Sequence, residues 1–195
     1  MEQQIPSRSV SRRSKTSKSS KSASTSTSRH SRRVLLKRRS VARQYRDEDW
    51  HFLWAAYAHG KGSLDKRLFP DGISQEEFPS LAKDIVGNIP AVFTLLGQNT
   101  KKGLIPVGLA VVGIEESKPW LHFEWFWWAT PRNKLETAVR FILKYRDDMV
   151  LFAAVPNKSR EAAFAERLGD FGVMRRIGTS FHWDGPTALF ETRGV

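Results

Sequence analysis

The residues best placed to do chemistry lie in one short stretch, FEWFWWATPRNKLE, at positions 123–136. Glu124 is the single carboxylate in its aromatic run, and His122 stands two residues earlier, on the same face if the run is a strand. Such a pair can exchange protons with a bound molecule. The alternative is structural: Glu124 pairs with an arginine in the sheet, and His122 is an ordinary sheet histidine.

A helix is expected to start directly after the aromatic run. Thr130 suits the N-cap and Pro131 suits the first helical position. Arg132, Asn133 and Lys134 then place two cations in the first turn, where they oppose the helix dipole. A bound anion would relieve that cost, whereas the alternative is a solvated first turn with no ligand.

The elements around this junction predict a mixed α/β sheet that is mostly antiparallel and flanked by helices. Helices are expected at 47–60, 74–87, 130–148 and 156–172, with a short one at 34–45, and strands at 91–96, 104–116, 120–129, 149–155, 173–183 and 187–193. The strand at 149–155 follows a helix, so it should run parallel to 120–129 through a right-handed crossover. Trp120, Trp125, Trp127 and Trp128 are expected to serve core packing.

Composition excludes several classes of protein. The 195 residues suggest one domain with an appendage, and they include no cysteine, so disulfides, thiolate metal sites and a cysteine nucleophile are excluded. No zinc signature is present, and we expect no metal. No apolar run would cross a bilayer and no secretory segment is visible, so we expect a soluble, intracellular protein without a membrane partner.

The positive charge is concentrated in residues 1–40, which hold 12 Lys/Arg and one acid, Glu2, for a net charge of +11; the other 155 residues hold 20 Lys/Arg and 19 Asp/Glu, for +1. This Ser-rich tract has few apolar residues, so we expect a disordered basic arm over 1–40 and a folded domain over 41–195. The basic residues of the arm are Arg8, Arg12, Arg13, Lys15, Lys18, Lys21, Arg29, Arg32, Arg33, Lys37, Arg38 and Arg39.

A chain segment with this charge is expected to bind nucleic acid or another polyanion, because its cations can displace the counterions of phosphates. Three alternatives stay open. The arm could be a solvating tail, an organelle transit peptide, or a nuclear-import signal centred on RRVLLKRRS, and phosphorylation of its serines would cancel its charge.

The order of elements, the 123–137 junction and the sequence NKSREAAFAERLG at 157–169 together resemble the GNAT acyltransferase superfamily over roughly residues 45–193. The stretch WATPRNKLE is also similar to GNAT-like proteins encoded by tailed bacteriophages. The resemblance implies a GNAT-like α/β fold and acetyl-CoA or another acyl-CoA as cofactor. A phage origin would imply the bacterial cytoplasm or the virion as location, with virion proteins as further partners.

The resemblance also assigns roles to particular residues. Glu124 is the candidate general base, with His122 as a second candidate. The cofactor would lie along a strand that splays from its neighbour, against the backbone of Phe126, Trp127 and Trp128. Its phosphates would lie at Arg132, Asn133 and Lys134, and Asn157 and Phe164 would contact it from the second helix.

The sequence departs from the family pattern at two places. Leu135 and Thr137 stand where the family's phosphate loop has glycines, and Pro131 supplies no amide. The family's catalytic tyrosine falls on Phe164 or Ala165. Two hypotheses therefore follow: an N-acyltransferase that uses acyl-CoA and an amine, or a non-catalytic GNAT-like phage component that binds DNA through its arm.

Overall fold

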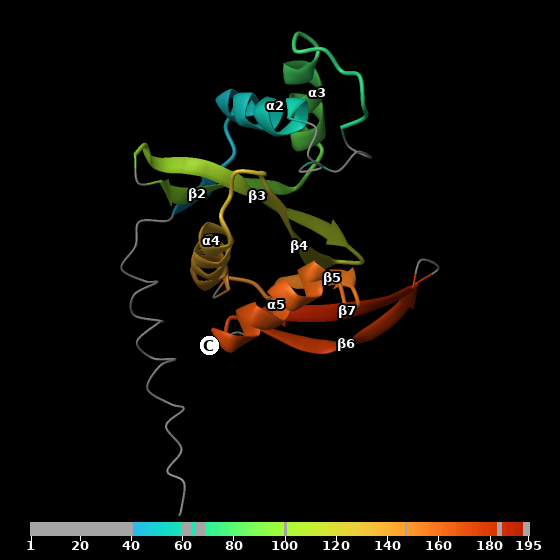
Figure 1. Ribbon diagram of the computed structural model, residues 1–195. Helices are drawn as coiled ribbons and strands as arrows, with labels where there is room; N and C mark the ends of the chain where they lie inside the picture. Colours follow the sequence, from blue (N-terminus) through green and yellow to red (C-terminus); the bar gives the residue numbers. More distant parts are fainter. Residues whose placement is uncertain are drawn as a thin grey trace, which may run out of the picture.

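The computed structural model describes residues 41–59, 64, 69–99, 101–146, 148–182 and 185–192. The predictions for the basic arm, for positions 34–40 and for a helix end at Gly60 lie outside these residues. The described chain forms a seven-stranded sheet in the order β1-β2-β3-β4-β5-β7-β6, with helices on both of its faces (Figure 1). Every neighbouring pair is antiparallel except β4 and β5, which are parallel.

The elements follow the predicted order, with one strand added at the start. The strands are β1 (Val41–Gln44), β2 (Ala91–Asn99), β3 (Gly103–Glu115), β4 (Lys118–Trp125), β5 (Phe152–Pro156), β6 (Met174–His182) and β7 (Gly185–Thr192). The helices are α2 (Trp50–Ala58), α3 (Phe78–Gly87), α4 (Pro131–Tyr145) and α5 (Arg160–Asp170), and a 3-10 turn, η1 (Asp47–Asp49), precedes α2.

Two of the predicted elements differ in the structure. Residues 41–44, expected to be helical, form the edge strand β1, because they pair with Phe93–Leu96 of β2. The strand expected over 120–129 ends at Trp125. The helix expected over 74–87 begins at Phe78, and Pro79 lies in its first turn, where no intrahelical amide bond is lost.

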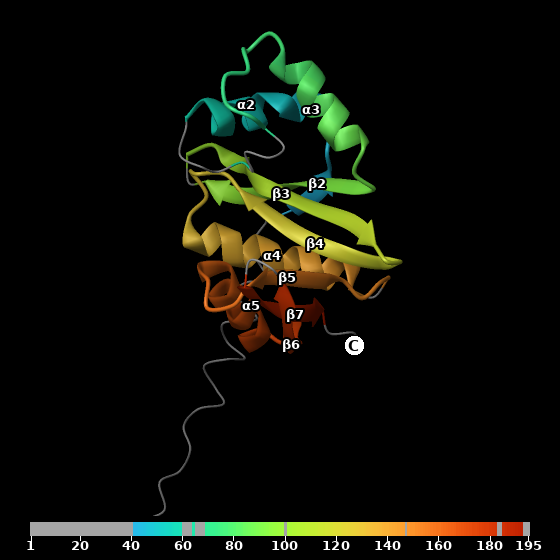
Figure 2. The ribbon, with the colours of Figure 1, turned by 90° about the vertical axis from the view of Figure 1, so that its right-hand side faces the viewer.

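Side chains of each strand point alternately to the two faces of the sheet, so the core has two layers. Val92 and Leu109 pack under α2 and α3, whereas Leu95, Ala110 and Leu121 pack against α4 and α5. Figure 2 shows α2 and α3 above the strands β2, β3 and β4, and α4 below these three strands. The apolar stripe of α4, formed by Leu135, Ala138, Val139 and Ile142, is buried in the second layer, and Thr130 caps the helix by accepting a hydrogen bond from the Asn133 amide.

The buried carboxylate of Asp49 links η1 to the strands β1 and β2. Asp49 is 3% exposed, and its two oxygens accept hydrogen bonds from the Arg43 guanidinium at 2.7 and 2.6 Å, from the Thr94 hydroxyl at 2.6 Å and from the Arg46 amide at 3.1 Å. Burial alone would raise the pKa of Asp49, but the bonds from Arg43, Thr94 and Arg46 outweigh it and hold the pKa below its usual value.

We predict that Asp49→Asn lowers the free energy of unfolding by about 2 kcal/mol at pH 7, because charged hydrogen bonds in a buried site are lost. A carboxyl whose folded pKa is depressed stabilises the protein above its unfolded pKa, and this contribution disappears as the pH falls through the folded pKa. The difference between wild type and variant in urea denaturation should therefore shrink below about pH 4. Asp47→Asn, at an exposed carboxylate of the same turn, is the control and should change little. A deficit that persists undiminished at pH 2 to 3 would contradict the assignment.

Candidate functional site

A cleft opens where β4 and β5 separate. The register of these two strands contains one pair, Trp120 with Phe152, near the start of each strand. Beyond that pair the strands diverge and leave a cleft of about 650 Å³. Its lining comes from β4, β5 and α5, together with Lys134 of α4 and Trp127. A cleft of this size is in the range that accommodates small molecules and cofactors.

His122 and Glu124 lie together on β4, as their spacing predicts. The His122 Nε2 atom is 3.2 Å from the Glu124 Oε2 atom, and the side chains are 68% and 21% exposed, respectively. Both residues line the cleft. The structure therefore provides a solvent-accessible carboxylate and imidazole in contact, which can accept a proton from a bound molecule and pass it to water.

The aromatic wall of the cleft comes from residues on the opposite face of β4 and from α5. Trp125 stacks on Phe123 and meets the Phe164 ring edge to face at 5.9 Å. Phe164 and Ala165, the two positions where the resemblance places a tyrosine, both line the cleft. No tyrosine lines the cleft among the residues that the structure describes.

Arg132, Asn133 and Lys134 are adjacent in sequence but make different contacts. The Arg132 Nε donates at 2.8 Å to the carboxylate of Glu136, which is 3% exposed, and the Asn133 side-chain amide donates at 3.3 Å to the Gln98 carbonyl of β2. Only Lys134 of the three lines the cleft.

The backbone at the start of α4 offers few free donors. Pro131 has no amide hydrogen, the Asn133 amide donates to the Thr130 hydroxyl at 3.2 Å, and the Lys134 amide donates to the Thr130 carbonyl at 3.0 Å. An anion at this end of the cleft would therefore depend on cationic side chains rather than on a cradle of amides.

Residues 126–128 leave the sheet and turn toward α2 and α3. The Phe126 amide donates to the Val107 carbonyl at 3.0 Å, and its ring is 1% exposed in the core layer beneath these helices. The Trp128 indole donates to the Pro106 carbonyl at 2.7 Å. Trp127 is 46% exposed, packs on His59 with ring centroids 4.0 Å apart, and borders the cleft.

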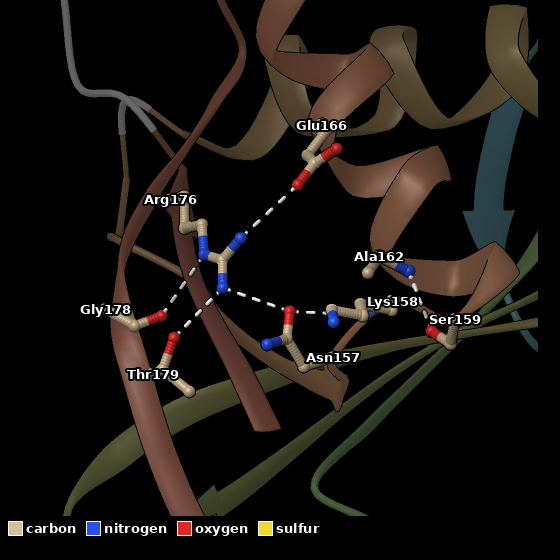
Figure 3. Close-up of polar contacts among 8 residues, drawn as sticks. All are labelled: Asn157, Lys158, Ser159, Ala162, Glu166, Arg176, Gly178 and Thr179. Atoms are coloured by element: carbon tan, nitrogen blue, oxygen red, sulfur yellow. Dashed lines mark hydrogen bonds and ion pairs between the residues drawn. The ribbon is translucent and has the colours of Figure 1, made fainter. Parts of the chain in front are cut away.

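Asn157 at the end of β5 has a bonded side chain and does not cap the following helix. Figure 3 shows its side-chain oxygen between Arg176 and the Lys158 amide, at 3.1 and 3.2 Å. Arg176 also donates to the Thr179 hydroxyl at 2.9 Å and lies 3.5 Å from Glu166 of α5. Ser159 supplies the cap, since its hydroxyl accepts from the Ala162 amide at 3.0 Å. Arg176 thus fastens β5 to β6 and α5.

Two charged residues of the cleft, Arg160 and Glu161, were not foreseen. They occupy the first turn of α5, and a signal for them exists in the sequence. Residues three and four positions apart on a helix share a face, so Arg160 and Glu161 lie on the same face as Phe164. Arg160 and Lys134 are the cations that line the cleft in the described part of the chain.

The part of the chain that the structure describes contains no group of three His, Cys, Asp or Glu residues arranged to hold a metal ion. Within the same residues, no helix is long and apolar enough to span a membrane.

Comparison with known proteins identifies the fold. No protein-family model matches the sequence, and no curated protein matches it. Among solved structures, the chain is similar to a GNAT-family acetyltransferase from Bacillus anthracis, with 18% identity, 79% of this chain and 94% of that chain covered, and a TM-score of 0.54. An aminoglycoside acetyltransferase in complex with coenzyme A matches with 11% identity, 79% and 95% covered, and a TM-score of 0.54.

A third similar structure is the Salmonella typhimurium acetyltransferase that modifies the N-terminal serine of a 50S ribosomal subunit protein, with 12% identity, 80% and 95% covered, and a TM-score of 0.54. At these identities the likeness shows the fold, and the predicted GNAT-like fold is confirmed.

We predict that Gly108→Ala disturbs the strand that carries Glu124. A Cβ at Gly108 would lie 2.4 Å from the Glu124 carbonyl oxygen and 3.2 Å from the Trp125 Cα, so β3 and β4 would have to separate there. The free energy of unfolding should fall by about 1–3 kcal/mol in urea denaturation.

Gly113→Ala, on the same strand, is the matched control, because a Cβ there meets nothing within 4 Å. It should be neutral or slightly stabilising. Equal losses in the two variants would show that close contact between β3 and β4 at Glu124 does not matter.

Proposed function

We propose that this protein is an N-acyltransferase that transfers an acyl group from acyl-CoA to an amine. The observation that carries the proposal is the Glu124 and His122 pair, exposed in a cleft between two splayed strands. The fold supports it, since the similar structures reported above are acetyltransferases and one of them contains coenzyme A.

The cleft fits an acyl-CoA in its apolar part and differs from the family pattern at the phosphate end. Trp125, Phe164 and Ala165 provide an apolar wall for a pantetheine arm, and the free edges of β4 and β5 beyond Trp120 and Phe152 offer backbone groups to it. Lys134 and Arg160 would hold the phosphates in place of backbone amides. When bound, acyl-CoA would supply the acyl group as an activated thioester.

The residues of the chain would act on the amine. Glu124 would accept a proton from the amine nitrogen as that nitrogen attacks the acyl carbon. The sulfur of the thioester would leave as a thiolate and take a proton from solvent. His122, which contacts Glu124 and is 68% exposed, passes the proton to solvent. The aromatic wall excludes water from the reacting atoms, which limits hydrolysis of the thioester.

We predict that Glu124→Gln lowers kcat by about 10²–10⁴, the usual contribution of a general base, while coenzyme A binds with unchanged affinity. Free thiol released from acetyl-CoA in the presence of an amine measures the rate, and calorimetry measures the binding. Glu115→Gln, at an exposed carboxylate next to the turn between β3 and β4, is the control and should keep full activity. Absence of both thiol release and binding heat with millimolar acetyl-CoA at low salt would contradict the proposed function.

We predict that Lys134→Ala weakens coenzyme A binding about tenfold, because one charged contact to a phosphate is lost. Arg132→Ala should weaken it much less, because that side chain is engaged with Glu136. The comparison of the two variants distinguishes a cation that contacts the phosphates from a neighbouring cation that does not, which the sequence alone cannot do. Equal losses in the two variants would contradict the assignment of Lys134 as the phosphate contact on α4.

A second proposal concerns the basic arm and a role without catalysis. The occupied amides of α4 and the lack of a tyrosine among the described cleft residues favour a role without catalysis. In this proposal the protein is a GNAT-fold component, such as a bacteriophage virion protein, that binds nucleic acid through residues 1–40. The net charge of +11 on those residues supports binding of nucleic acid. Affinity for duplex DNA should fall steeply with salt and disappear when residues 1–40 are deleted. Retained affinity in the deletion variant would contradict this proposal.

A further inference from the structure

The cleft between β4 and β5 has an open end and an inner end. At the open end the strands are farthest apart, and Lys134 and Arg160 belong there to the first turns of the helices that follow the two strands. The inner end lies at the one pair that the strands share, Trp120 with Phe152. Glu124 lies further along β4, toward the open end. The cleft therefore continues past the candidate base, away from the cations.

Four buried apolar residues line the inner end of the cleft. Leu121 and Ala153 directly follow the two residues of the pair that joins β4 to β5. Leu168 comes from the last turn of α5, and Met174 pairs with Thr192, whose hydroxyl accepts from the amide just before β5. The four side chains are between 1% and 9% exposed, although they line the cleft. The inner end is therefore a sheltered space with an apolar surface.

The distance from the candidate base to the inner end sets the length of a group that could fill this space. Leu121 precedes Glu124 by three positions on an extended strand, so the two are about 10 Å apart along β4. An extended acyl chain of about eight carbons has the same length. An acetyl group, with two carbons, would leave most of the inner end empty, and the side chains that line an empty space lose contacts.

We propose that the preferred acyl donor carries an unbranched chain of medium length, about six to eight carbons. This inference rests on the proposed function. The phosphates lie at Lys134 and Arg160, the thioester carbon lies at Glu124, and the alkyl chain continues between Leu121 and Ala153 into the inner end. The small side chain of Ala153 leaves room for the alkyl chain where the gap between the strands is narrowest.

The test is calorimetry with a series of thioesters, from acetyl-CoA through butanoyl-, hexanoyl- and octanoyl-CoA to decanoyl-CoA, in the absence of an amine. We expect the affinity to rise up to about fourfold for each added methylene as far as octanoyl-CoA, because each buried methylene adds apolar contact. The rise should stop at decanoyl-CoA, when the inner end is filled.

Two results overturn the inference and leave the proposed function standing, provided that an amine still releases thiol from acetyl-CoA. One is an affinity that does not change along the series. The other is an affinity that rises by the same factor through decanoyl-CoA, because that rise reports the hydrophobicity of the thioester and not a space that ends at Leu121. If no thioester binds and no thiol is released, the proposed function fails and the inference fails with it.

A pair of variants locates the effect. Ala153→Val adds two carbon atoms at the inner end, so it should weaken octanoyl-CoA binding about tenfold, as removal of about two buried methylenes would, and weaken acetyl-CoA binding much less. Ala163→Val makes the same substitution at an exposed position of α5 that does not line the cleft, and it should change neither affinity. Equal losses for the two thioesters in Ala153→Val overturn the inference. If that variant does not fold, the series with the wild type decides.

Discussion

The candidate site depends on the way β4 and β5 meet. Each strand is fully paired on its other side, since β4 pairs with β3 as far as Trp125 and β5 pairs with β7 along its length. Toward each other they share the single pair of Trp120 and Phe152. The opening gives the Glu124 and His122 pair access to both faces of the sheet, which neither a closed ladder nor two separate sheets would provide.

An opening inside a sheet leaves backbone groups without strand partners, so its two sides must be held by other contacts. On the β4 side, Gly108 lets β3 approach the Glu124 backbone more closely than any residue with a Cβ would. On the β5 side, Arg176 binds Asn157, Thr179 and Glu166, so the end of β5 is tied to β6 and α5 (Figure 3). Each wall of the opening therefore has contacts of its own, and beyond Trp120 and Phe152 the facing edges of β4 and β5 do not pair with each other.

The sequence predicts the type of most elements, because periodicity reports which face of each element is buried. The prediction is wrong where contacts with residues distant in the sequence determine the secondary structure. Residues 41–44 become a strand because β2 offers an edge, and β4 ends at Trp125 because Phe126 turns into the layer beneath α2 and α3. Neither partner is visible in the local pattern.

The candidate site shows the same division. The spacing of two residues on a strand predicts that His122 and Glu124 contact each other, because that geometry is local. The contacts of the next three residues are not predictable in this way. Arg132 bonds to the buried Glu136, Asn133 bonds to a carbonyl of β2, and Lys134 lines the cleft. Sequence motifs therefore locate the helix start correctly, but they do not identify which of the two cations lines the cleft.

The two ends of the cleft are built by different means, so changes at one end need not alter the other. Thr130 and Pro131 make a stable helix start, and they do so by using or removing the amides that would otherwise bind phosphate. Lys134 and Arg160 can replace those amides only as flexible charges, which hold an anion with less directional precision and are more sensitive to salt. The carboxylate and imidazole on β4 depend instead on strand pairing and on the separation from β5. The start of α4 and the carboxylate and imidazole pair on β4 therefore rest on separate contacts, and a change at one need not disturb the other.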